Sequence, residues 1–189
     1  INSLLDLDES EPILYLDKQS KGFNYGQIIT TEVIKILDFF NESKMTNISY
    51  EFGDIGGASL DKYNKPITDE TLESARKSDA VLLASVGTPK YDNNARVLKP
   101  EHGLLVLRKY LNLFINIRPI FTFNTLLDFS SIKSELIDEL DIVIIRELIG
   151  DVYFGEPRGF KDVNGERVGY NTMLYSESEV QRITKFAID

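Results

Sequence analysis

The chain has 189 residues, of which 42% are hydrophobic and 27% are charged, a balance typical of a globular protein rather than a disordered one. Its 30 acidic and 21 basic side chains give a formal net charge of -9, which argues against a nucleic-acid partner. No apolar run is long enough to cross a membrane. The sequence has no cysteine, so disulfides, thiolate metal sites and a cysteine nucleophile are excluded.

The first part of the sequence alternates between expected strands and expected helices. Short apolar runs predict strands, and apolar residues that recur every three or four positions predict helices. The strands are expected at residues 12–16, 48–52 and 80–87, and the helices at residues 26–40, 69–77 and 101–110. Thr68 is predicted to cap the second helix. Residues 53–68, which are rich in Gly, Asp and Asn, are expected to form a loop.

The rest of the sequence predicts two further strands and a final helix. Residues 114–123 have a strand pattern that Pro119 restricts to an edge or a bend. Four consecutive apolar residues, 142–145, predict a strand that is buried on both faces. Ser176 and Glu179 form a capping-box pattern, which predicts a helix from there onward. Strands alternating with helices predict an α/β protein with a mostly parallel sheet flanked by helices.

Three arginines lie within apolar sequence at the ends of expected elements, namely Arg108, Arg118 and Arg146. A guanidinium group that leaves a buried strand is costly unless an anion meets it. A surface carboxylate explains any one of them, and Glu147 or water is the expected partner of Arg146 in the free protein. Three such positions favour a ligand with more than one carboxylate beyond the carboxyl ends of the strands, because guanidinium binds carboxylate through two parallel hydrogen bonds.

Three stretches of the sequence carry a more specific pattern: "DETLESARKSDAVLLASVGTPKY", "KPEHGLLVLRKYLNLFINIRP" and "IVIIRELIGDVYFGEPRG". They resemble the 3-isopropylmalate dehydrogenases, which belong to a superfamily of metal-dependent β-decarboxylating dehydrogenases that also contains isocitrate dehydrogenase. The resemblance extends over residues 12–187. It implies a truncated isocitrate/isopropylmalate dehydrogenase-like fold, with residues 1–113 from the large cofactor-side domain and residues 114–189 from the dimer-forming domain.

The resemblance also implies roles for individual residues. The three arginines match the residues that bind the malate carboxylates, and Tyr153 matches a catalytic tyrosine that transfers a proton after decarboxylation. Leu104 and Leu105 match the apolar pocket for the isopropyl group, whereas isocitrate-specific relatives place a serine in that region. Glu101 matches the glutamate that lies between the substrate and the nicotinamide.

The implied reaction is an NAD-dependent oxidative decarboxylation of a small dicarboxylate in leucine biosynthesis, assisted by Mg²⁺ or Mn²⁺. Residues 154–176 correspond to the arm through which two subunits of the family pair, which implies a homodimer. We expect a cytoplasmic protein or one of an organelle matrix, because relatives work in both compartments.

The sequence departs from the family in places that concern the cofactor and the metal. Residues 17–27 are longer than the family's glycine-rich loop and put larger side chains where glycines let the backbone approach NAD. Thr88 also stands in place of a family glycine. The family's catalytic lysine and three metal-binding aspartates are expected beyond Asp189. No metal ligand is therefore assigned in this chain, and the chain alone is expected to show no turnover.

The other acidic residues and the lone histidine are interpreted as structural. The acidic ones lie in expected loops and helix starts, where capping and solvation are the usual roles; they are Asp61, Asp69, Asp79 and Asp92. His102 is interpreted as a helix-surface residue and not as a base.

Two hypotheses from different classes follow from these features. In the first, the chain is part of a 3-isopropylmalate dehydrogenase-like enzyme that is active when complete. In the second, it is a catalytically degenerate relative that acts as a structural or regulatory subunit of a larger assembly. The arginines, Tyr153 and the leucine pair favour the first, and the altered loop favours the second.

Overall fold

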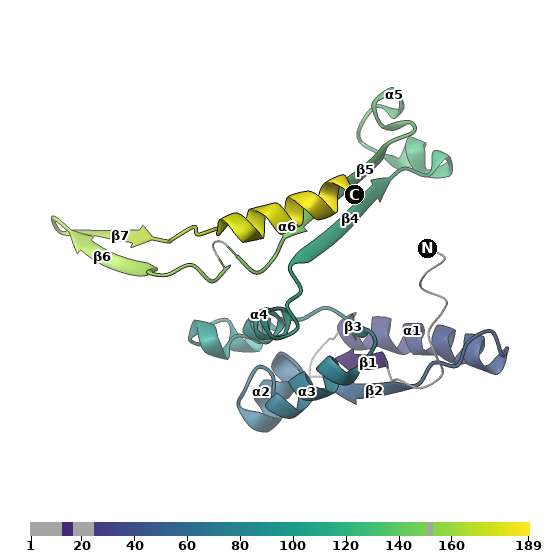
Figure 1. The fold of residues 1–189 in the computed structure, drawn as a ribbon, viewed down its shortest axis with the longest axis horizontal. Coiled ribbons are helices and arrows are strands. Elements are labelled where there is room, and N and C mark those ends of the chain that lie inside the picture. The colour runs from purple at the N-terminus through teal and green to yellow at the C-terminus, as the bar shows by residue number, and fades with distance from the viewer. Residues whose placement is uncertain (1–12, 17–24, 151–152) are drawn as a thin grey trace. The chain divides into compact units, whose positions relative to one another are not determined.

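The computed structural model describes residues 13–16, 25–150 and 153–189 (Figure 1). The chain divides into two compact units, Ile1–Leu111 and Asn112–Asp189. The expected loop at residues 17–27 lies mostly outside the described residues.

The first unit contains a three-stranded parallel sheet with the strand order β2-β1-β3. Strand β1 (Ile13–Leu16) lies in the middle and pairs with β2 (Tyr50–Gly53) and β3 (Val81–Leu83). Helix α1 (Tyr25–Glu42) connects β1 to β2, as parallel strands require a long crossover connection. These elements confirm the strands and the first helix that the sequence pattern predicts.

Three more helices of this unit follow β2 in sequence. They are α2 (Gly57–Tyr63), α3 (Asp69–Lys77) and α4 (Pro100–Tyr110). The prediction of a loop over residues 53–68 was wrong, because α2 forms within it. The turn-forming residues of that stretch flank the helix: Gly56 is its N-cap, and Asn64 is its C-cap with a left-handed φ of 53°.

Short 3-10 turns occupy the stretch between β3 and α4. They cover Pro89–Tyr91 and Arg96–Leu98. Thr68 caps α3 as predicted, since its hydroxyl accepts a hydrogen bond from the Thr71 amide at 3.2 Å.

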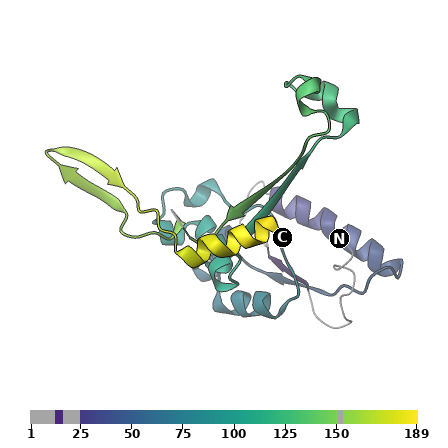
Figure 2. The ribbon, with the colours of Figure 1, turned by 45° about the horizontal axis from the view of Figure 1, so that its top comes forward.

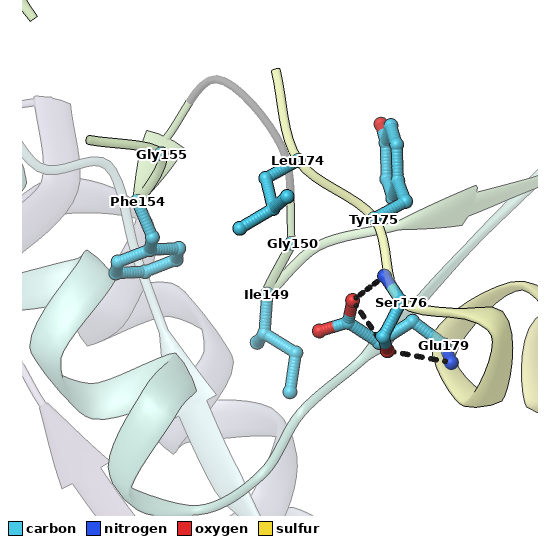
Figure 3. Close-up of a pocket in the computed structure, with 8 residues that line it drawn as sticks. All are labelled: Ile149, Gly150, Phe154, Gly155, Leu174, Tyr175, Ser176 and Glu179. Atoms are coloured by element: carbon cyan, nitrogen blue, oxygen red, sulfur yellow. Dashed lines mark hydrogen bonds between the residues drawn. The ribbon is translucent and has the colours of Figure 1, made fainter. Parts of the chain in front are cut away.

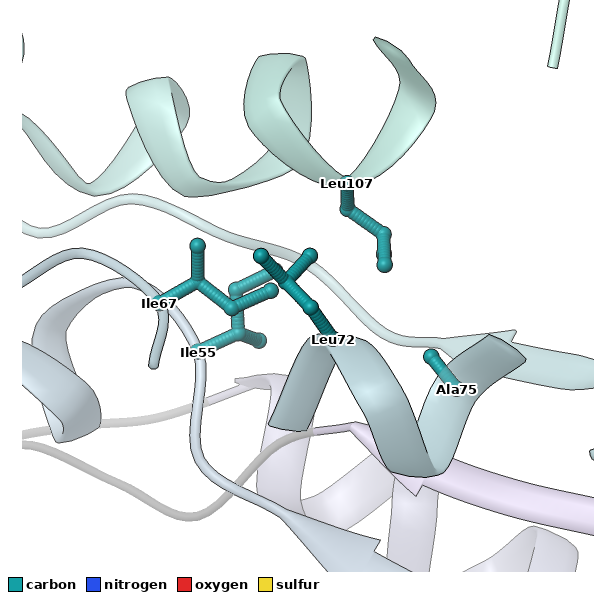
Figure 4. Close-up of a cluster of buried hydrophobic side chains, with 5 residues drawn as sticks. All are labelled: Ile55, Ile67, Leu72, Ala75 and Leu107. Atoms are coloured by element: carbon teal, nitrogen blue, oxygen red, sulfur yellow. The ribbon is translucent and has the colours of Figure 1, made fainter. Parts of the chain in front are cut away.

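The core of the first unit lies where α3 and α4 meet the loop segments on either side of α2 (Figure 4). It consists of five buried apolar side chains, which are Ile55, Ile67, Leu72, Ala75 and Leu107. Helix α4 comes so close to the segment after α2 that a Cβ on Gly103 would lie 2.4 Å from the carbonyl oxygen of Pro66. Only a residue without a side chain fits there, and this contact fixes which face of α4 turns inward.

Where the structure describes the second unit, its strands pair antiparallel, and the parallel pairing that it describes lies in the first unit. Strands β4 (Ile115–Phe121) and β5 (Asp141–Glu147) pair along their whole length and form a two-stranded ribbon. The connection between them contains a 3-10 helix, Asn124–Phe129, and α5 (Ser134–Ile137).

Strands β6 (Gly159–Val163) and β7 (Glu166–Tyr170) form a hairpin within residues 154–176. Figure 2 shows this hairpin extending away from the β4–β5 ribbon of the same unit. The last helix, α6 (Glu177–Ile188), begins at Ser176 with the capping box that the sequence predicts.

The prediction that residues 142–145 form a strand buried on both faces was wrong. Ile142, Val143 and Ile144 are 47%, 53% and 45% exposed. In the described part of the chain, β4 and β5 form a two-stranded ribbon, and no other elements cover both of its faces.

Candidate active site

Helix α4 carries four of the predicted site residues along one stripe. Glu101, Leu104, Leu105 and Arg108 recur at spacings of three and four residues, which places them on one side of the helix. The inward face of α4 is formed instead by Pro100, Gly103 and Leu107, all buried. Leu104, Leu105 and Arg108 are half-buried and Glu101 is exposed. The core contacts therefore hold α4 so that this stripe remains accessible beside the packed face.

The loop after β3 lies against the carboxylate of Glu101. A Cβ on Gly87 would lie 3.0 Å from Glu101 Oε1, and Gly87 has a φ of 134°. Both features require glycine at this position, because a side chain would be strained and crowded.

Asp61 on α2 fixes the end of the same loop. Its Oδ1 accepts hydrogen bonds from the Lys90 ammonium and the Tyr91 hydroxyl. These two hydrogen bonds, first that from Lys90, lower the pKa of Asp61. Asp61 was interpreted from the sequence as a capping or solvated carboxylate, and this role was missed. Its only sequence signal was the Lys-Tyr pair that directly follows the Gly-Thr-Pro turn.

Arg118 and Arg146 lie on the same face of the β4–β5 ribbon. In the register of the ribbon, Asn116 stands directly opposite Arg146, and Arg118 stands opposite Ile144. Residues opposite each other in an antiparallel pair share a face, as do residues two apart in one strand. Arg118 and Arg146 are therefore diagonal neighbours, with Asn116 beside both.

Tyr153 belongs to the same group of side chains. Arg146 Nη2 donates a hydrogen bond to the Tyr153 hydroxyl, and the Arg146 guanidinium carbon lies 5.4 Å from the centre of the Tyr153 ring. A cation over an aromatic ring is an attractive contact. The structure thus brings Arg118, Arg146 and Tyr153 together within the second unit.

Glu147 is not the partner of Arg146, contrary to one of the two expectations. Successive residues of a strand point to opposite faces, so Glu147 turns away from Arg146. Its carboxylate pairs with Arg182 of α6 at 3.1 Å instead. Among the described residues, no carboxylate forms an ion pair with Arg118 or Arg146.

Arg108 lies in the first unit, whereas Arg118, Arg146 and Tyr153 lie in the second. That all three guanidinium groups bind one ligand stays a prediction. The same holds for the apolar pocket that the resemblance assigns to Leu104 and Leu105.

The second unit also contains a pocket of about 360 Å³ near the start of α6 (Figure 3). None of the predicted site residues lines it; its lining consists of Ile149, Gly150, Phe154, Gly155, Leu174, Tyr175, Ser176 and Glu179. The Glu179 carboxylate is already bonded to the amide and hydroxyl of Ser176, so it is committed to capping. Among the described residues of the lining, Glu179 is the one charged side chain.

The described residues do not by themselves fit a divalent metal or a dinucleotide. No three acidic, histidine or cysteine side chains within this part of the chain come close enough to hold a metal ion. Glu101 is the one described residue that was predicted to contact NAD. A single exposed carboxylate is not sufficient to bind a dinucleotide.

His102 differs from its interpretation as a helix-surface residue. It is half-buried, and its Nδ1 atom is buried without a hydrogen-bond partner in the part of the chain that the structure describes. Burial, and to a smaller extent the nearby Arg96 guanidinium, lower the pKa of His102. Both effects disfavour the charged imidazolium.

Two solved structures share the fold of this chain. The chain aligns with an isocitrate dehydrogenase from Methylococcus capsulatus with a TM-score of 0.70 at 21% identity, covering 95% of this chain and 47% of that one. It also aligns with a β-decarboxylating dehydrogenase from Thermococcus kodakarensis with a TM-score of 0.60 at 26% identity, covering 95% of this chain and 45% of that one. The fold is that of the decarboxylating dehydrogenases.

The family follows from sequence. The model of the isocitrate/isopropylmalate dehydrogenase family matches residues 20–189, so the chain belongs to this family. It is 48% identical over 168 residues to the 3-isopropylmalate dehydrogenase of Neisseria meningitidis serogroup A and 49% identical over 166 residues to that of Thiobacillus denitrificans. Each alignment covers 88% of this chain and 47% of the relative. The chain thus spans about half the length of the curated relatives it matches.

None of the helices in the described ranges is both long and apolar enough to span a membrane.

Proposed function

We propose that the complete protein to which this chain belongs oxidatively decarboxylates 3-isopropylmalate, with NAD as the oxidant and Mg²⁺ or Mn²⁺ as the metal. The observation that carries the proposal is the shared face of Arg118, Arg146 and Tyr153 on the second unit. Two adjacent guanidinium groups without a carboxylate partner in the described chain form a site for an anion. The identity to enzymes named 3-isopropylmalate dehydrogenase supports the choice of this particular dicarboxylate.

In this proposal each side chain has one task. Arg118 and Arg146, together with Arg108, bind the carboxylates, and Leu104 and Leu105 contact the branched alkyl group. Tyr153 donates its hydroxyl proton to the carbon that loses carbon dioxide. The guanidinium group of Arg146 holds the Tyr153 hydroxyl on the arginine face, so the proton donor lies next to the bound carboxylate.

Three further parts of the proposal rest on family membership. Glu101 is expected to lie near the nicotinamide, and residues 154–176 are expected to pair two copies as a homodimer. The protein is expected to work in the cytoplasm or an organelle matrix.

The test is turnover of isopropylmalate by the complete protein, with NAD and magnesium. We expect Arg146→Ala to lower kcat/KM by about 30-fold or more, since a charge-assisted contact to a carboxylate contributes roughly 2–3 kcal/mol. Arg76→Ala is the matched control, because Arg76 pairs with Glu73 on the surface of the first unit and should leave kcat/KM unchanged. A decrease of less than tenfold for Arg146→Ala would contradict the assigned role.

Tyr153→Phe separates binding from chemistry. Loss of a general acid lowers kcat by about 100-fold or more, whereas KM should change little because the ring remains. If the unmodified complete protein binds isopropylmalate but shows no turnover, the degenerate-subunit hypothesis replaces the enzymatic one.

A further inference from the structure

Asn116 lies at the centre of the arginine face, although no prediction from the sequence included it. It stands opposite Arg146 in the ribbon and two residues before Arg118, so its side chain shares their face. Asn116 Oδ1 accepts a hydrogen bond from Arg118 Nε at 2.6 Å. The alternation of "NIR" in the sequence was the available signal, since it places Asn116 and Arg118 on the same side of any strand.

This hydrogen bond determines how Arg118 presents its guanidinium group. A carboxylate binds guanidinium either through Nε and one terminal nitrogen or through both terminal nitrogens. Because Asn116 occupies Nε, the first mode is closed and the second remains. The terminal nitrogens of Arg118 are then directed to a ligand end-on.

The neutrality of Asn116 has a consequence of its own. An aspartate at this position would accept the same hydrogen bond, but its negative charge would cancel the positive charge of Arg118. An amide orients the guanidinium and leaves both positive charges of the face available. A site for a substrate with more than one carboxylate needs that charge.

We propose that Asn116 is a positioning residue for the substrate: it holds Arg118 end-on and, being uncharged, preserves the charge that a dicarboxylate requires. The inference rests on the proposed function for the identity of the substrate. The orientation of Arg118 itself does not depend on that identity.

The orientation is tested on this chain without any activity measurement. In a nitrogen-15 NMR spectrum of the arginine side chains, the Nε–H signal of Arg118 should shift and exchange faster with water in Asn116→Ala. Asn116→Asp should keep the slow exchange, because it keeps the acceptor. Asn124→Ala, an exposed asparagine outside the ribbon, is the control and should leave the signal in place. An unchanged Arg118 signal in Asn116→Ala would overturn the proposal.

The role of the charge is tested on the complete protein. We expect Asn116→Ala to raise KM for isopropylmalate by roughly 3- to 10-fold with kcat within about twofold, the size of one lost hydrogen bond. Asn116→Asp should raise KM at least as much, although its hydrogen bond is intact. A KM of Asn116→Asp equal to that of the wild type would show that only the hydrogen bond to Arg118 matters and that the charge at position 116 does not. This result would overturn the proposal.

Failure of the proposed function and failure of the inference about Asn116 give different experimental results. If the unmodified complete protein shows no turnover, the proposed function fails together with the substrate assigned to this site. The NMR comparison still decides whether Asn116 orients Arg118. If turnover is present and the KM values of Asn116→Ala and Asn116→Asp equal that of the wild type, the proposed function stands and the inference about Asn116 is overturned.

Discussion

Arg182 on α6 donates a hydrogen bond to Glu147 at the end of β5, with 3.1 Å between Nη2 and Oε1. The other carboxylate oxygen accepts the amide protons of Ile149 and Gly150 at 3.1 and 2.8 Å. The side chain of Glu147 is only 10% exposed. One carboxylate therefore joins the ribbon, the turn after it and the last helix.

Glu147→Ala should lower the free energy of unfolding of the second unit by roughly 2–4 kcal/mol, because it leaves a cation and two amides without their partner. Hydrogen exchange at the amides of Ile149 and Gly150 should accelerate with it. Glu135→Ala is the control, since the Glu135 pair with Lys133 is 3.7 Å long and its side chain is 74% exposed, so its loss costs about 0–1 kcal/mol. Equal effects of the two substitutions would contradict this account.

Gly103→Ala should destabilise the first unit, although alanine usually favours a helix. The new Cβ would lie 2.4 Å from the Pro66 carbonyl oxygen, so α4 or the loop has to move. We expect a loss of about 1–3 kcal/mol in chemical denaturation. Lys109→Ala, on the exposed side of the same helix, should change stability little. A neutral or stabilising Gly103→Ala would show that the close approach is not required.

The start of α6 should be sensitive to acid. The amide and hydroxyl hydrogen bonds from Ser176, together with Arg182, lower the pKa of Glu179 below its ordinary value of 4.5. A carboxyl group with a lowered pKa in the folded state stabilises that state above its ordinary pKa, and the effect is lost as pH falls through the lowered value. Hydrogen exchange of the first turn of α6 should therefore accelerate in this acidic range.

Glu179→Gln should remove this pH dependence, and Glu177→Gln, in the same turn but outside the capping box, should keep it. At neutral pH, Ser176→Ala should cost about 0.5–2 kcal/mol of helix stability. A pH dependence that survives in Glu179→Gln would assign the effect to another group.

His102 is the single histidine of the sequence, so its imidazole signals are unambiguous in NMR. Because burial lowers its pKa, titration should occur below 6.5. Below that pH the unfolded chain binds more protons than the folded one, so stability should fall as pH falls from 6.5 through the folded pKa. Arg96→Ala should raise the pKa only in part, since burial is the larger cause. A titration at or above 6.5 would contradict the buried environment.

Features that depend on neighbours in sequence could be predicted. Thr68 caps α3 and Ser176 caps α6 because each hydroxyl meets an amide three residues away, wherever the helix itself is placed. The shared face of Arg118 with Asn116 follows in the same way from the two-residue repeat of a strand.

Features that depend on partners distant in sequence could not. Ile142, Val143 and Ile144 have the composition of a covered strand, yet their exposure depends on which elements pack against the faces of β5, which apolar residues in sequence do not specify. Helix α2 was not predicted from the sequence, because its glycines and asparagine are also turn residues. The burial of Leu60 favours the helix.

The sequence by itself determined the family and the capping of α3 and α6, because the family motifs and the helix caps depend on residues that are close together in the chain. Only the tertiary structure decided that Arg146 contacts Tyr153 while Glu147, its neighbour in the chain, pairs with Arg182. The physical reason is the alternation of a strand: adjacent residues point to opposite faces, and each face meets whatever the fold brings to it.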